Sequence, residues 1–140
     1  MALVCLLADM VDVYSLRPDA ITTDWSYWRS FPDEVVVMPS GDEYVAAVSS
    51  HSTYHYLSVC SSDRYIFALY SGQKMDEPYY TTGSRIRVVS WDRSFSKELE
   101  LPDRLVSIQL SPDGNTLYGI NQTEEGYEIK TYELANSLNS

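Results

Sequence analysis

The chain has 140 residues, of which 44% are hydrophobic and 21% charged, a composition typical of one globular domain. Twenty acidic residues against ten basic ones give a net charge of -10, which repels polyphosphate and excludes nucleic acid as an expected partner. No run of the sequence approaches the roughly 18 to 20 apolar residues of a membrane-spanning helix, so we expect no membrane span.

Features that would reveal a cellular compartment are missing from the sequence. Residues 1–5 end in cysteine, as a bacterial lipoprotein signal does, but the basic start and the apolar run of about 7 to 15 residues are missing. We therefore expect no signal peptide here. Cys5 and Cys60 each lie in an apolar stretch typical of a strand, where a thiol packs as a small hydrophobe. Nothing in the sequence pairs them in a disulfide.

The hydrophobic pattern predicts strands throughout the chain and no amphipathic helix. Short runs alternate apolar with polar residues, which puts one face of each run against a core and the other toward water. We therefore expect an all-β chain of antiparallel strands. The predicted strands lie near residues 3–7, 10–16, 35–38, 44–49, 55–60, 65–70, 85–91, 95–101, 105–110, 116–121 and 127–134.

Three of these strands share one sequence pattern. The segments 11–16, 86–91 and 129–134 alternate β-branched or aromatic residues with polar ones, and their starts are 75 and 43 residues apart. The second interval matches the roughly 40 to 45 residues of a four-stranded propeller blade. The first interval is longer, and we attribute the excess to an insertion.

Tight turns separate the predicted strands. Pro112, Asp113 and Gly114 stand between two apolar runs, where Pro presets φ, Asp bonds the local backbone and Gly accepts a positive φ. The segments 38–48 and 60–69 repeat this layout, the latter without Gly. Three strand–turn–strand units are therefore expected.

Two polar segments rich in aromatic residues are predicted as loops. The segment 24–31, bounded by Pro18 and Pro32, is the expected insertion, and residues 71–84 form a second loop rich in Gly, Pro and Tyr. The prediction is then one domain, 1–140, made of propeller blades. It divides into a partial blade with the aromatic insertion (1–50), two blades (51–102 and 103–134) and a tail (135–140).

Tyrosine-rich and alternating motifs in the C-terminal half carry a family resemblance. They are Tyr65–Gly72, Ile86–Asp92 leading to Leu99–Leu101, and Leu117–Ile120 with Ile129–Leu134. Over residues 55–134, and more weakly over 3–16, the chain resembles the TolB-like six-bladed β-propellers of Bacteroides-type bacteria. The resemblance implies an architecture and a binding surface, with a place in the cell envelope or periplasm, and it supplies no catalytic residues.

The chain differs from that family in length. Six blades of about 45 residues need roughly 270 residues, about twice the length of this chain. Either two or three copies complete the ring, or the chain is a truncated product. Open blades expose unpaired strand edges, so we expect homo-oligomers unless loops such as 17–34 cover those edges.

Residue types that catalyse reactions or bind metals are present but not suitably arranged. His51 and His55 would share one face of a helix, but their segment is predicted to run from loop into strand. There is no Gly-x-Ser-x-Gly motif, the carboxylates fall mostly in turns and on outward positions, and the Asp113 turn lacks the acidic spacing of a calcium loop. We expect no catalytic residue, metal or cofactor.

Aromatic residues in the two predicted loops are the candidates for ligand binding. Flat rings give a large contact area at low entropic cost to a sugar, a peptide or a neighbouring subunit. The alternative is a loop packed against the blade edge by its own aromatic residues. The candidates are Trp25, Tyr27, Trp28 and Phe31 in the first loop and, with a weaker signal, Tyr79 and Tyr80 in the second.

These observations favour a non-catalytic propeller module that binds a protein, peptide or glycan, because blades present variable loops on a rigid scaffold. A second hypothesis is a hydrolase or lyase whose acidic residues meet in a funnel completed by oligomerisation. A third is a remnant without an independent role. The sequence names no ligand.

Overall fold

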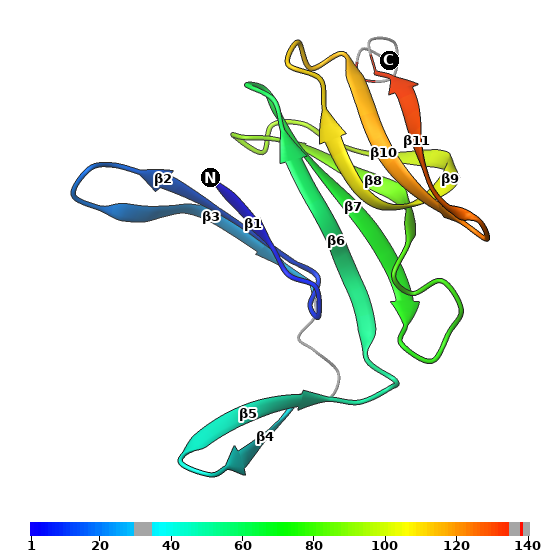
Figure 1. Cartoon of the computed structure of the whole chain (residues 1–140). Coiled ribbons are helices and arrows are strands. Elements are labelled where there is room, and N and C mark those ends of the chain that lie inside the picture. The colour runs from blue at the N-terminus through cyan, green and yellow to red at the C-terminus, as the bar shows by residue number, and fades with distance from the viewer. Residues whose placement is uncertain (30–34, 135–137, 139–140) are drawn as a thin grey trace.

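The structure is a computed structural model that describes residues 1–29, 35–134 and 138 (Figure 1). Over these residues the chain is all-β with antiparallel pairing and contains no helix, which confirms the predicted fold class at this level. No helix in the described part is long and apolar enough to cross a membrane. The strands are β1 (Ala2–Val4), β2 (Met10–Leu16), β3 (Ile21–Trp28), β4 (Val35–Ser40), β5 (Glu43–Val48), β6 (Thr53–Ser61), β7 (Tyr65–Lys74), β8 (Gly83–Ser90), β9 (Ser96–Leu110), β10 (Thr116–Thr123) and β11 (Gly126–Glu133).

Strands β6 to β11 form one six-stranded sheet in which each strand pairs with its neighbours in the sequence. Alternation decides which side chains face the core. On β7, Phe67 and Leu69 point to one face, while Ala68 and Tyr70 point to the other. Both faces of β7 are buried, so this strand lies in the middle of the molecule.

β9 is one strand of 15 residues, whereas the sequence predicted two strands over 95–101 and 105–110. Its first half pairs with β8 and its second half pairs with β10. Pro102 favoured a break because it has no N–H to donate to a ladder. In the structure, however, Pro102 lies at the register shift between Glu100 and Leu105, where it has no paired residue on β8 or β10.

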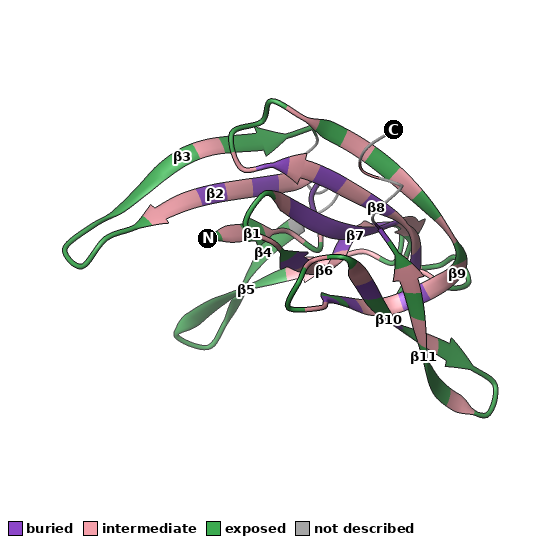
Figure 2. Cartoon of the chain, turned by 90° about the horizontal axis from the view of Figure 1, so that it is seen from above, coloured by how far each residue is buried: buried purple, intermediate pink, exposed green. Residues whose placement is uncertain are grey.

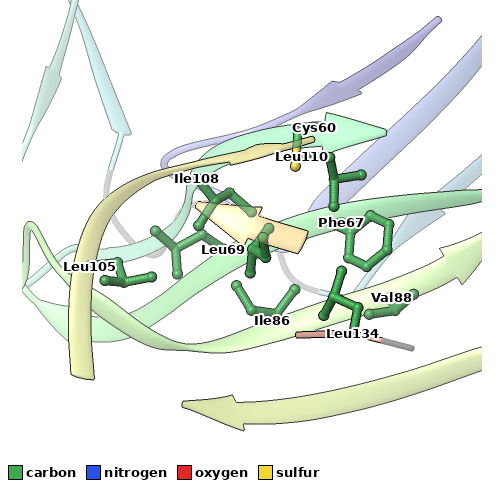
Figure 3. Packing of buried hydrophobic residues seen from close by; sticks show 10 residues of the cluster. Cys60, Phe67, Leu69, Ile86, Val88, Leu105, Ile108, Leu110 and Leu134 are labelled. Carbon is green, nitrogen blue, oxygen red and sulfur yellow. The ribbon is translucent and has the colours of Figure 1, made fainter. Parts of the chain in front are cut away.

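The long strand curls the sheet so that its two halves face each other. The second half of β9 lies against β6, where the Ile108 N–H donates to Ser58 Oγ at 3.2 Å and Ser58 Oγ lies 3.3 Å from Ser107 Oγ. Between the halves is the main hydrophobic core (Figure 3). Its buried members are Cys60, Phe67, Leu69, Ile86, Val88, Leu105, Ile108, Leu110, Leu117 and Leu134.

A three-stranded sheet, β1-β2-β3, covers the other face of β6, β7 and β8. Val11 and, less completely, Trp25 pack there against Ala68, Tyr56 and Tyr70. The backbone joins the two sheets as well, because residues 55 and 56 on β6 donate to the carbonyls of residues 6 and 5. The two sheets therefore make three successive layers. The first is β1 to β3, the second is β6 to β8 with the first half of β9, and the third is the second half of β9 with β10 and β11.

The prediction of an insertion loop over 24–31 was wrong for its described part. Residues 21–28 form β3, which pairs with β2 through a hairpin whose turn contains Pro18. Trp, Tyr and Thr, which dominate the segment, are strand formers, so the local preference was present in the sequence. The second predicted loop is also shorter than expected. β7 runs to Lys74 and β8 begins at Gly83, so 75–82 connects them.

Exposure differs strongly between the parts of the structure. Figure 2 shows buried residues concentrated in β7 and β8, whereas β3 and the hairpin of β4 and β5 are largely exposed. The hairpin forms a separate two-stranded sheet. Gly41, with a φ of 66°, makes its turn, which agrees with the turn expected there.

Candidate functional site

A pocket of about 480 Å³ opens between the three-stranded sheet and the adjacent face of the six-stranded sheet. Strands β2 and β3 supply one wall, and β6, β8, β9 and the turn from β8 to β9 supply the other. The lining residues are Val11, Trp25, Tyr27, Arg29, Tyr56, Arg87, Val89, Arg93, Ser96, Lys97 and Glu98.

Two aromatic side chains of β3 form part of the wall. Trp25 and Tyr27 are two residues apart and so lie on the same face of the strand. The Trp25 Nε1–H donates to the Trp91 carbonyl oxygen at 2.7 Å, which fixes the indole against the turn that follows β8. The Arg93 guanidinium lies 5.2 Å from the Trp25 ring, within the range of a cation–π contact. Tyr27 is more exposed and is available for contact.

Four basic side chains surround this wall. They are Arg29, Arg87, Arg93 and Lys97, and Glu98 is the one acidic residue that lines the pocket in the described part of the chain. The whole sequence has only ten Lys and Arg residues against twenty Asp and Glu. The pocket therefore concentrates positive charge on an otherwise acidic protein.

A buried polar cluster underlies the pocket and joins the two sheets. The Tyr56 hydroxyl donates to Asp9 Oδ1 at 2.7 Å, and Arg87 Nη1 donates to the same oxygen at 2.7 Å and to Tyr56 Oη at 2.8 Å. Asp9 is only 3% exposed, so its charge is compensated by these charge-assisted hydrogen bonds. The Arg29 backbone N–H also donates to the Asp9 carbonyl at 2.9 Å.

The protonation states in the cluster follow from burial and hydrogen bonding. Burial and the hydrogen bond to Asp9 raise the pKa of Tyr56, so this phenol stays neutral and remains a donor. For Arg87, burial lowers the pKa, but the bonds to Asp9 and Tyr56 raise it more, and the net shift is upward. The guanidinium therefore keeps its charge beside the pocket.

Tyr70 and His55 extend the cluster away from the pocket. The Arg87 guanidinium lies 4.0 Å from the centre of the Tyr70 ring, and the Tyr70 hydroxyl lies 3.1 Å from His55 Nδ1. His51 is instead exposed, with Nδ1 2.7 Å from Asp76 Oδ2. In the part of the chain that the structure describes, no group of three or more His, Cys, Asp or Glu side chains could hold a metal ion.

The structure separates the six residues predicted to bind a ligand. Trp25 and Tyr27 line the pocket, whereas Trp28 is 55% exposed and does not line it. Tyr79 and Tyr80 lie in the 75–82 connection, where Tyr80 packs edge-on against Tyr54 with ring centres 5.0 Å apart. The sixth, Phe31, lies outside the described residues.

Sequence reasoning missed the basic residues of the pocket and the Asp9 cluster. One signal was present in the predicted strand 85–91. Arg85 and Arg87 alternate there with Ile86 and Val88, so they had to lie on the face opposite the core. The net charge of the whole chain concealed this local excess of cations. The position of Asp9 in a short bend had no comparable signal.

A larger hollow of about 950 Å³ opens at the end of the main core, between the turns that follow β6 and β9. Its polar groups are mostly used within those turns. Ser111 Oγ donates to Asp113 Oδ1 at 2.6 Å, and the Asn115 N–H donates to the same oxygen at 3.0 Å. These bonds lower the pKa of Asp113 and stabilise the predicted turn. The pocket between the sheets is therefore the better candidate.

Scans against family models, against curated proteins and against solved structures each found no match. The resemblance to TolB-like propellers consequently stays a prediction from the motifs in residues 55–134.

Proposed function

We propose that this chain is a non-catalytic binding module made of propeller blades, and that its ligand occupies the pocket between the two sheets. The observation that carries the proposal is the position of Trp25 and Tyr27, whose rings line a pocket of about 480 Å³. Small-ligand sites commonly have volumes of roughly 300 to 1,000 Å³ and aromatic walls. A ligand with the volume of a short peptide segment or of one or two sugar units would fit the pocket.

The arrangement of the layers supports the propeller assignment within this proposal. Propeller blades are antiparallel sheets set around an axis. The three successive layers begin with β1, with β6 and with the second half of β9. The first layer contacts the second through residues 5 and 6, which follow β1, and the second layer contacts the third through Ser58 on β6. The 43-residue repeat corresponds to β8 and β11, each the third strand of its layer.

Copies of the chain complete the ring in this proposal. Three layers are half of six, so two copies would suffice. The outer face of β10 and β11 is apolar and uncovered, and its members are Tyr118, Ile120, Tyr127 and Ile129. At the other end of the stack, Leu3 and Trp28 are exposed on the three-stranded sheet. If the outer face of β10 and β11 of each copy packed against the three-stranded sheet of the other copy, the ring would close.

A rival hydrolase would need two carboxylates, or one carboxylate with a histidine, to converge on an open cleft. The carboxylate of Asp9 is instead buried beneath Arg87 and Tyr56, and Glu98 is the one carboxylate that lines the pocket within the described residues. The geometry therefore favours binding.

Glycan and peptide arrays probed with the purified chain test the binding function. Tyr27→Ala removes a ring from the pocket without removing a hydrogen bond that holds the sheets together, so ligands bound by the wild type should be lost or weakened about tenfold. Tyr44→Ala, on the exposed face of β5, is the matched control and should bind as the wild type does. Equal binding by wild type and Tyr27→Ala would count against the pocket as the site.

A further inference from the structure

Among the described residues, the lining of the pocket has four basic side chains and one acidic side chain. Arg87 is paired twice, with Asp9 at 2.7 Å and with Glu98 at 3.5 Å between Nε and Oε2. Arg29, Arg93 and Lys97 add three further positive charges to the same lining. Because Glu98 is already paired with Arg87, the charges of Arg29 and Arg93 are not offset by a further carboxylate among the described residues of the lining.

Two of the guanidinium groups make no bond that would occupy them. Among the described residues, no hydrogen bond or ion pair involves the side chain of Arg29 or Arg93. Guanidinium groups present forked donors that match the two oxygens of a carboxylate or phosphate. Both residues therefore retain their full capacity to bind an anion.

The backbone at Arg93 is unusual and places its side chain over the aromatic wall. Its φ of 63° lies in the left-handed region, which a residue with a side chain rarely adopts and which glycine or asparagine would favour. The turn is held by Asp92, which accepts hydrogen bonds from the Ser94 N–H at 3.0 Å and from the Ser90 hydroxyl at 2.7 Å. A cation is thereby fixed 5.2 Å from the Trp25 ring.

We propose that the ligand of this pocket is a small acidic molecule that carries a carboxylate or phosphate on a flat ring. The inference rests on the proposed function, because it takes the same pocket as the binding site. The ring would contact Trp25 and Tyr27, and the oxyanion would bind Arg29 and Arg93. Arg87 is a positioning residue, since its guanidinium is held by Asp9.

Three naphthalene probes that differ only in their polar group test the charge requirement. They are 2-naphthamide, which is neutral, 2-naphthoate and 2-naphthyl phosphate. Binding is followed by titration of ¹⁵N-labelled protein, with the Trp25 indole N–H as the reporter of the pocket. We expect the two anions to bind at least about tenfold more tightly than the amide, and the difference to shrink as salt is raised.

Single-charge variants locate the anion. Arg29→Gln and Arg93→Gln should each weaken 2-naphthoate about tenfold and leave 2-naphthamide within about twofold. Arg17→Gln is the matched control, because it makes the same change in net charge at the turn between β2 and β3, away from the pocket. Its affinity for 2-naphthoate should stay within about twofold of the wild type.

The outcomes separate the inference from the proposed function. Equal affinity for all three probes, lost in Tyr27→Ala, would overturn the acidic ligand and leave the pocket as a binding site. No response of the Trp25 indole to any probe would overturn the acidic ring ligand, whereas the binding function itself is tested by the glycan and peptide arrays with Tyr27→Ala. Tighter binding of the phosphate than of the carboxylate, or the reverse, supports the inference and identifies which oxyanion the pocket prefers.

Discussion

Arg87 on β8 and Asp9 beside β2 belong to different sheets, and their side chains meet at 2.7 Å between Nη1 and Oδ1. Tyr56 on β6 donates to the same carboxylate oxygen, so one acidic group receives bonds from two strands of the opposite sheet. The pair is mostly screened from water, with Asp9 almost fully buried and Arg87 partly so. This contact therefore holds the wall of the pocket in place.

Asp9→Ala should destabilise the fold by about 3 kcal/mol, because it leaves the Arg87 guanidinium and the Tyr56 hydroxyl without their shared acceptor. Urea unfolding followed by circular dichroism measures the free energy of unfolding. Asp19→Ala, in the exposed turn between β2 and β3, serves as the control and should change the stability by less than about 0.5 kcal/mol.

Adding Arg87→Met to Asp9→Ala should recover part of that loss, because an apolar side chain replaces a cation that no longer has its partner. A double variant whose destabilisation equals the sum of the two single variants would show that Arg87 and Asp9 do not interact.

Gly83→Ala should destabilise the chain by about 3 kcal/mol or more, because the start of β8 approaches the backbone of β7 closely. A Cβ at Gly83 would lie 2.3 Å from the Tyr70 carbonyl oxygen, and the main chain cannot move aside as a side-chain end can. The melting temperature of the variant is the measurement. Ser84→Ala tests the neighbouring position, where a small change is expected, and a similar melting temperature for both variants would contradict the close approach.

The buried thiol of Cys60 should make the free energy of unfolding fall as the pH rises above 8.5. Burial raises its pKa to about 11 in the folded chain, whereas an unfolded thiol titrates near 8.5. Above pH 8.5 the unfolded state therefore loses its proton first, which favours unfolding by about 2 kcal/mol at pH 10. Well below pH 8.5 the Cys60 thiol is protonated in both the folded and the unfolded state, so it does not lower the free energy of unfolding there.

Urea titrations at pH 7, 8.5, 9 and 10 measure this dependence, and Cys60→Ala provides the comparison. The variant is less stable at neutral pH because it leaves a small cavity, but its stability should depend less on pH between 8.5 and 10. Identical slopes for the two proteins would show that Cys60 does not contribute. Cys5, which is less buried, should react first with a thiol reagent at pH 8.

Most strands of the fold could be predicted because alternation is a local property of the sequence, but β3 was predicted as a loop. Ile86 and Val88 face the core and Arg85 and Arg87 face away, as a period of two requires. The connectivity of β9 was less accessible, because Pro102 is a strong local signal for a break. Only the interruption of the pairing between Glu100 and Leu105, which depends on the curl of the whole sheet, makes the proline compatible with a continuous strand.

The candidate site was accessible only in part. Trp25 and Tyr27 stood out as aromatic residues in a polar segment, but their common face became apparent only once the segment was known to be a strand. The cations of the pocket come from three separate places in the sequence, around residues 29, 87 and 93–97. Their convergence depends on how two sheets pack, and no local pattern encodes it.

Light scattering coupled to size-exclusion chromatography tests whether copies of the chain associate. We expect a discrete dimer, because the outer face of β10 and β11 leaves four large apolar side chains uncovered, with Ile129 as much as 75% exposed. Ile120→Lys combined with Ile129→Lys places two charges on that face and should convert the dimer to a monomer. Leu16→Lys, at the exposed end of β2, is the control and should leave the mass unchanged.

A wild-type chain that runs as a monodisperse monomer would contradict ring closure by two copies. The pocket between the sheets would still be complete in that case, because every residue of its lining comes from one chain. Binding and association are therefore independent properties of the molecule, and a monomer that retains binding would point to an open stack of three layers as the functional form.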